Sequence, residues 1–108
     1  MVNITSTIVK LQDIHIRCYI AGDSGPPVIL LHGAGVDSAM MSWGEVIPFL
    51  AKHYRVFAPD LPGYGASDKP DVVYSLAYYV NILKHLMEHF GLKKAHLMGL
   101  SLGGGISL

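Results

Sequence analysis

The sequence has little cysteine, little charge and no long apolar run. Its single cysteine, Cys18, cannot form an intrachain disulfide, and residues 1–10 lack the pattern of a secretory leader, so we expect a cytoplasmic protein. Charged residues make up 15% of the chain and the formal net charge is +0, which favours neither nucleic acid nor an anionic membrane as a partner. Apolar stretches such as residues 28–31 are far too short to cross a bilayer.

Hydrophobic residues are abundant instead, at 51% of 108 residues. That length suits one small domain with a buried core, and the apolar content excludes disorder. The high apolar content also predicts that much of the apolar surface must be covered by other parts of the protein or by a partner.

Two short β-segments are predicted near the start of the chain, at residues 6–12 and 14–21. In the second, Ile14, Ile16, Cys18 and Ile20 alternate with other residues, which is typical of a half-exposed antiparallel hairpin. A turn rich in glycine and proline follows at residues 22–27. Residues 28–31 are then apolar at every position, as in a central parallel strand covered on both faces.

The spacing of apolar residues next predicts a helix over residues 42–52, followed by a strand at 55–58. Pro48 lies inside this helix and favours a kink or a late start. The expected buried face of the helix consists of Trp43, Val46, Ile47, Leu50 and Ala51.

A second helix is predicted from its N-cap, Ser75, to Gly91, a suitable residue just beyond its C-terminus. Its expected apolar stripe is Leu76, Tyr79, Val80, Leu83, Met87 and Phe90. A short strand at 95–98 and the start of a third helix at Leu102 follow. This order predicts an α/β fold in which an antiparallel N-terminal hairpin precedes parallel strands with helices on both faces, and ligands bind at the carboxyl ends of such strands.

Three motifs follow predicted strands. Gly99-x-Ser101-x-Gly103 is typical of a sharp strand-to-helix turn that exposes a serine hydroxyl at a helix N-terminus, where the Leu102 amide can stabilise negative charge. The alternative is a glycine-rich turn with an incidental serine.

The second motif, residues 32–35, allows the Ala34 amide to be another donor to an oxyanion. For His32 itself, a structural or supporting role is favoured over that of a base. The third motif, residues 60–70, predicts a tight reversal of the chain in which the Asp60 and Asp68 side chains cap nearby amides.

The segments VILLHGAG, DLPGYGASDKP and AHLMGLSLGG resemble the oxyanion loop, the loop after strand 4 and the nucleophile elbow of the α/β-hydrolase fold superfamily. The resemblance covers the N-terminal portion of that fold. It implies Ser101 as nucleophile and the amides of Ala34 and Leu102 as the oxyanion hole. Supporting positions are His32, Gly33, Gly35, Gly99 and Gly103.

Serine at the elbow separates the chain from the haloalkane dehalogenase and epoxide hydrolase branches, whose nucleophile is a carboxylate. The resemblance therefore implies hydrolysis of an ester, thioester, amide or carbon–carbon bond of a small molecule through an acyl-enzyme. It implies no metal and no organic cofactor.

In this superfamily the triad acid and histidine follow the serine, whereas residues 102–108 contain neither. We therefore expect residues 1–108 to form a partial domain with strands 1–5, two helices and the start of a third. It would lack the lid and the C-terminal half, and would be inactive alone.

The family's sheet order makes the strand at 95–98 an open apolar edge, which predicts self-association or pairing with a missing C-terminal segment. Two other functions stay open. One is a non-catalytic module that binds a ligand or partner, and the other is a self-sufficient domain in which His32 activates Ser101.

Overall fold

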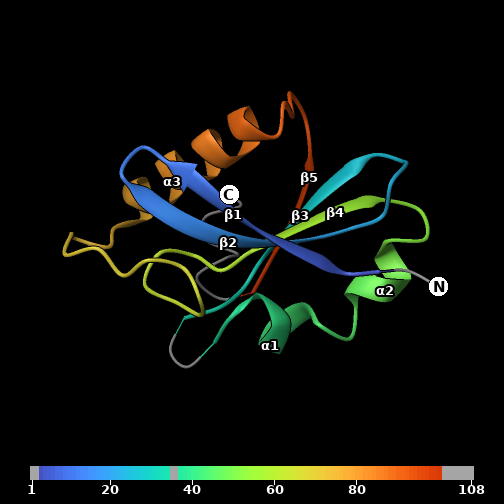
Figure 1. The fold of residues 1–108 in the computed structure, drawn as a ribbon, viewed down its shortest axis with the longest axis horizontal. Helices are drawn as coiled ribbons and strands as arrows, with labels where there is room; N and C mark the ends of the chain where they lie inside the picture. Colours follow the sequence, from blue (N-terminus) through green and yellow to red (C-terminus); the bar gives the residue numbers. More distant parts are fainter. Residues whose placement is uncertain (1–2, 35–36, 101–108) are drawn as a thin grey trace.

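A computed structural model describes residues 3–34 and 37–100, and Figure 1 shows its arrangement. The strands are β1 (Thr5–Leu11), β2 (Ile14–Ala21), β3 (Pro27–Leu31), β4 (Arg55–Pro59) and β5 (His96–Gly99). The helices of this part of the chain are α1 (Ala39–Trp43), α2 (Ile47–Leu50) and α3 (Leu76–His89).

The strands form a single mixed sheet in the order β1-β2-β4-β3-β5. β1 and β2 pair antiparallel, and β2 also pairs antiparallel with β4. β3 lies parallel to both β4 and β5. The predicted hairpin followed by a parallel sheet is therefore confirmed.

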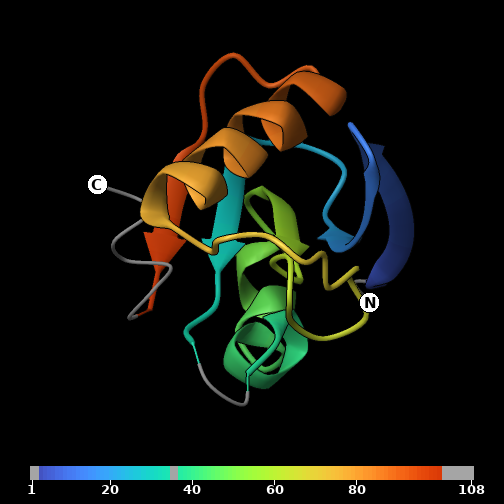
Figure 2. The ribbon, with the colours of Figure 1, turned by 90° about the vertical axis from the view of Figure 1, so that its left-hand side faces the viewer.

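Helices cover both faces of this sheet: Figure 2 shows α3 on one side and α1 with α2 on the other. Ile29 and Leu31 of β3 belong to the cluster that includes α3, whereas Val28 and Leu30 belong to the cluster that includes α1 and α2. Since successive side chains of a strand point to opposite faces, a strand between two helical layers must be apolar at every position. The two layers account for the high apolar content.

Helix α3 begins and ends close to the predicted residues. The Ser75 hydroxyl accepts a hydrogen bond from the Tyr78 amide at 3.1 Å, and Gly91 adopts a φ of +68° just after the helix. Its buried face, however, is Tyr79, Ile82, Leu83 and Leu86. The predicted stripe is wrong about Leu76, the first residue of α3, which is 51% exposed.

The single helix predicted over residues 42–52 is wrong: two short helices, α1 and α2, replace it. Pro48 lies in the first turn of α2, where an N–H group would have no hydrogen-bond partner within the helix. The late helix start that Pro48 favours is therefore observed. Trp43, Ile47 and Ala51 are buried as expected, but Val46, between the two helices, is exposed.

β5 starts one residue later than predicted and is the outermost strand on its side of the described sheet. The helix predicted from Leu102 lies outside the described residues.

Candidate active site

Two of the predicted motifs meet at the carboxyl edge of the sheet. Leu31, the last residue of β3, is in register with Gly99, the last residue of β5, and the Leu100 amide donates to the Leu31 carbonyl at 3.1 Å. The chain that leads into Ser101 therefore runs beside the chain that leads into His32. Figure 2 shows the ends of β3 and β5 side by side.

Four of the predicted site residues fall outside the described part of the chain. These are Ser101, Leu102, Gly103 and Gly35. His32, Gly33, Ala34 and Gly99 are described, so the structure covers the loop after β3 as far as Ala34 and the end of β5.

His32 is fully buried and uses both ring nitrogens within the fold. Its Nδ1 lies 2.7 Å from the Gly33 carbonyl, and its Nε2 accepts from the Leu61 amide at 3.0 Å. Because a carbonyl can only accept and an amide can only donate, the ring is the tautomer protonated on Nδ1. His32 thus ties the loop after β3 to the loop after β4, with the Tyr64 ring edge-on at 5.0 Å, and has no free nitrogen to act as a base.

The same hydrogen bond orients the peptide group between Gly33 and Ala34. In a planar trans peptide the C=O and N–H point in opposite directions, so a carbonyl held by His32 directs the Ala34 amide away from that ring. Ala34 is exposed, and among residues 3–34 and 37–100 no acceptor pairs with its amide.

Asp37, which is not among the predicted site residues, holds the loop after β3. Its carboxylate accepts from the Gly33 amide at 2.8 Å, the Ser38 amide at 2.7 Å and the Ser42 hydroxyl at 2.7 Å. Partial burial raises the pKa of Asp37, but the hydrogen bonds from Ser42, Ser38 and Gly33 outweigh it and hold the pKa below its usual range. An Asp-Ser pair just before a helix is the signal that could have revealed this role.

Asp60 caps nearby amides, as predicted. It is 1% exposed, and its two oxygens accept from the amides of Ala39 and Ala66 at 2.8 and 2.9 Å. Ala39 is the first residue of α1, so the carboxylate binds the start of that helix to the loop after β4. A β-carbon on Gly65, whose φ is +52°, would overlap this carboxylate.

Asp68 also caps an amide as predicted, that of His15 at 2.8 Å, while Ser67 accepts from the Arg17 amide at 2.8 Å. The hydrogen bond that the His15 amide gives Asp68 is the main cause that lowers the pKa of Asp68. These contacts fasten the loop after β4 along β2.

The remaining histidines lie away from the meeting point of β3 and β5. His53 precedes β4 and His96 is the first residue of β5, so both lie at the amino ends of these strands. His85 and His89 lie in the second half of α3. His15 lies on β2, which β4 and β3 separate from β5, a distance of about 14 Å at the usual strand spacing.

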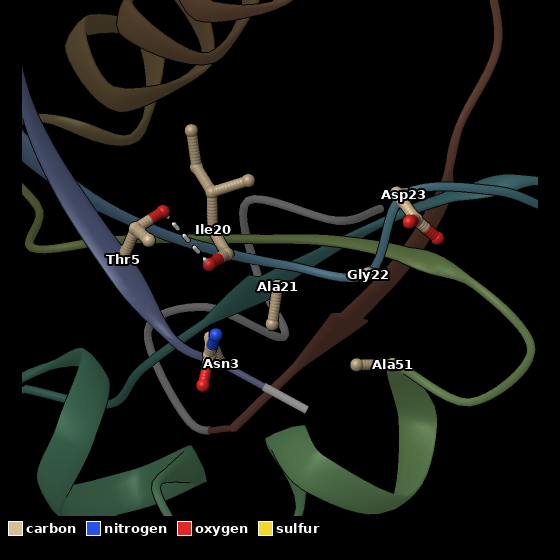
Figure 3. A pocket seen from close by; sticks show the side chains of 7 residues that line it. All are labelled: Asn3, Thr5, Ile20, Ala21, Gly22, Asp23 and Ala51. Carbon is tan, nitrogen blue, oxygen red and sulfur yellow. Dashed lines mark hydrogen bonds between the residues drawn. The ribbon is translucent and has the colours of Figure 1, made fainter. Parts of the chain in front are cut away.

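A pocket of about 340 Å³ lies beside the end of β2, and Figure 3 shows the side chains that line it. Ala21 in the pocket wall pairs with Val56, so the pocket lies near the start of β4. The predicted motifs instead follow the ends of their strands. None of the predicted site residues is among those that line it, namely Asn3, Thr5, Ile20, Ala21, Gly22, Asp23 and Ala51.

Neither a metal site nor a membrane span is found in the part of the chain that the structure describes. Its histidine, cysteine and acidic side chains do not gather in groups of three that could hold an ion. None of its helices has the length and hydropathy needed to cross a bilayer.

The sheet order, the helices on both faces and the two loops that meet at its carboxyl edge define an α/β hydrolase arrangement. The family model described as alpha/beta hydrolase fold matches residues 26–108, and the chain belongs to this family.

Its relatives include named hydrolases. The chain is 39% identical over 92 residues to an uncharacterized protein of Mycobacterium tuberculosis, an alignment that covers 85% of the chain and 26% of that protein. It is 37% identical over 92 residues to the 2-hydroxy-6-oxo-6-(2'-aminophenyl)hexa-2,4-dienoic acid hydrolase of Metapseudomonas resinovorans, covering 83% of the chain and 32% of the relative. A fluoroacetate dehalogenase of a Burkholderia species is also 37% identical, over 102 residues, which cover 90% of the chain and 33% of that enzyme.

Among solved structures, a 2-hydroxy-6-oxo-6-phenylhexa-2,4-dienoate hydrolase from a Rhodococcus species superimposes with a TM-score of 0.88 at 35% identity. The match covers 99% of this chain and 41% of that one. The chain thus spans about a quarter to a third of the length of the curated relatives that it matches.

Proposed function

We propose that this chain carries the nucleophile and the oxyanion hole of a serine hydrolase. The observation that supports this most directly is the pairing of Leu31 with Gly99, because it brings the loop that bears Ala34 beside the strand that leads into Ser101. A nucleophile and an amide donor must lie close together to act on one carbonyl group.

In the proposed reaction the Ser101 hydroxyl attacks a substrate carbonyl, and the amides of Ala34 and Leu102 donate to the oxygen that becomes negative. The base takes the Ser101 proton during the attack and gives it to the leaving group as the tetrahedral intermediate collapses and the scissile bond breaks. Water then attacks the acyl-enzyme, which releases the acid and restores the Ser101 hydroxyl. We assign the base and its acid partner to residues outside these 108, since His32 has both nitrogens engaged.

The class of substrate is proposed from chemistry and from the relatives together. Serine at residue 101 suits attack on a carbonyl carbon, which differs from the carboxylate nucleophile of the dehalogenase and epoxide hydrolase branches. Several relatives are named as hydrolases of 2-hydroxy-6-oxo-dienoates or of 2-hydroxymuconate semialdehyde. Such dienoates and small activated esters are therefore the first substrates to test. We also propose a cytoplasmic location.

The test compares the protein made from its complete reading frame with its Ser101→Ala variant. A fluorophosphonate probe should label the first and not the second, and kcat should fall on the order of 10⁶-fold in the variant. Equal labelling or equal turnover by both proteins contradicts the assignment. A folded protein with neither labelling nor turnover also contradicts it, and favours a non-catalytic binding module.

A further inference from the structure

Gly33 stands at the base of the oxyanion loop, and both of its backbone polar groups are held by side chains. Its amide donates to Asp37 at 2.8 Å, and its carbonyl lies 2.7 Å from Nδ1 of His32. Since glycine has the widest backbone freedom, its conformation at this point depends on such external contacts.

The two contacts control different peptide groups. His32 holds the group between Gly33 and Ala34, whose N–H is the proposed oxyanion donor, and Asp37 holds the preceding group, between His32 and Gly33. With one group held, the other can still swing about the Gly33 α-carbon, because φ and ψ are the soft torsions of the chain. With both held, the direction of the Ala34 N–H is fixed.

Asp37 is itself rigidly placed by the start of α1. Its remaining hydrogen bonds come from the Ser38 amide and the Ser42 hydroxyl, both at 2.7 Å. The amide of Ala39, the first residue of α1, donates to the buried Asp60 at 2.8 Å. A continuous series of hydrogen bonds therefore connects the loop after β4, the helix α1 and the base of the oxyanion loop.

We propose that Asp37 is a positioning residue that fixes the oxyanion donor of this site; the inference rests on the proposed function. Its carboxylate acts through Gly33 and does not contact the reacting atoms. Because the donor interacts most strongly with the charge that develops in the transition state, loss of Asp37 lowers kcat and leaves KM nearly unchanged.

The kinetic test uses Asp37→Ala and Asp37→Asn in the protein made from its complete reading frame. Loss of a whole oxyanion donor costs about 10²–10³ in kcat, so a misaligned donor should cost about 10-fold to 100-fold in Asp37→Ala. Asp37→Asn should recover part of this loss, because its one carbonyl oxygen can still accept from the Gly33 amide.

The control is Ser75→Ala, which removes the side-chain hydrogen bond at the N-cap of α3. It should leave kcat unchanged, and an equal loss of kcat in Ser75→Ala and Asp37→Ala overturns the proposal. If Asp37→Ala does not fold, Ser42→Ala removes one hydrogen bond to the same carboxylate and should lower kcat a few-fold; full activity of that variant overturns the proposal.

A second readout is independent of activity. Amide hydrogen exchange at Gly33 should be slow in the parent protein and at least ten times faster in Asp37→Ala. Unchanged exchange at Gly33 overturns the inference even where Ser101 proves to be the nucleophile. Turnover that persists in Ser101→Ala contradicts the proposed function instead, and with it the role of Asp37.

Discussion

Among single residues, Asp60 shows how a buried charge can hold several segments together. Its side chain is almost completely buried, and both oxygens accept hydrogen bonds from backbone amides, those of Ala39 and Ala66. Burial of a carboxylate is tolerated when it is paired in this way, and loss of the carboxylate would leave the two amides without their acceptor.

Asp60→Ala should therefore destabilise the protein by about 2 kcal/mol, since the buried Ala39 amide left unsatisfied costs about 1–3 kcal/mol, while Ala66 is exposed and its amide can bond to water. Urea unfolding followed by circular dichroism measures the change. Asp71→Ala is the control, because Asp71 is exposed and its loss should change the free energy of unfolding by less than about 0.5 kcal/mol. A loss below about 1 kcal/mol for Asp60→Ala contradicts the anchoring role.

That Asp60 and Asp68 cap amides could be predicted because both lie in a turn, and the bond from the Ala66 amide to Asp60 is local. Their partners Ala39 and His15 are distant in the sequence, so those two bonds depend on how the chain packs.

Asp37 follows the same rule, because its carboxylate accepts from the Gly33 and Ser38 amides, and the Asp-Ser pair before α1 is its local signal. The sequence alone does not show which conformation of the loop after β3 brings the Gly33 amide to this carboxylate.

For the secondary-structure elements, local signals determine the ends of α3 better than its buried face. Ser75 and Gly91 mark the ends through their own backbone and capping chemistry. The face is set by packing: Ile82 and Leu86, which the predicted stripe omits, are buried in the core, whereas Val80, Met87 and Phe90 are only partly buried against it. Periodicity alone does not distinguish these two groups of residues.

Gly91→Ala should lower stability by about 1 kcal/mol, because alanine is strained in the left-handed region that Gly91 occupies at φ +68°. A β-carbon there would have no atom within 4 Å, so the cost is conformational and not steric. Thermal unfolding should show a lower Tm for Gly91→Ala and a smaller decrease for Gly91→Asn, since asparagine tolerates this conformation. Equal decreases in the two variants would refute the conformational explanation.

For the molecule as a whole, the described sheet has two edge strands, β1 of the hairpin on one side and β5 on the other. The mixed sheet with two helical layers could be predicted, because strands that are apolar at every position must lie between two covered faces. Pro48 predicts a late helix start, but the apolar spacing does not predict the separate helix α1 that precedes it. The position of β4 between β2 and β3 is not specified by local sequence, since it depends on which strand edges meet.

β5 carries an unpaired edge within the described residues, and Met98 on this strand is 41% exposed. An uncovered apolar edge strand is a template for pairing with another chain. The 108-residue chain alone should therefore elute as dimers or larger species in size-exclusion chromatography with light scattering. Met98→Lys should shift the population toward the 11.7 kDa monomer, because a charge on an edge strand opposes pairing. Met41→Lys, which changes a 68% exposed methionine on α1, should leave the distribution unchanged. A parent chain that is monomeric at tens of micromolar, or an equal response to both substitutions, shows that β5 is not the associating edge.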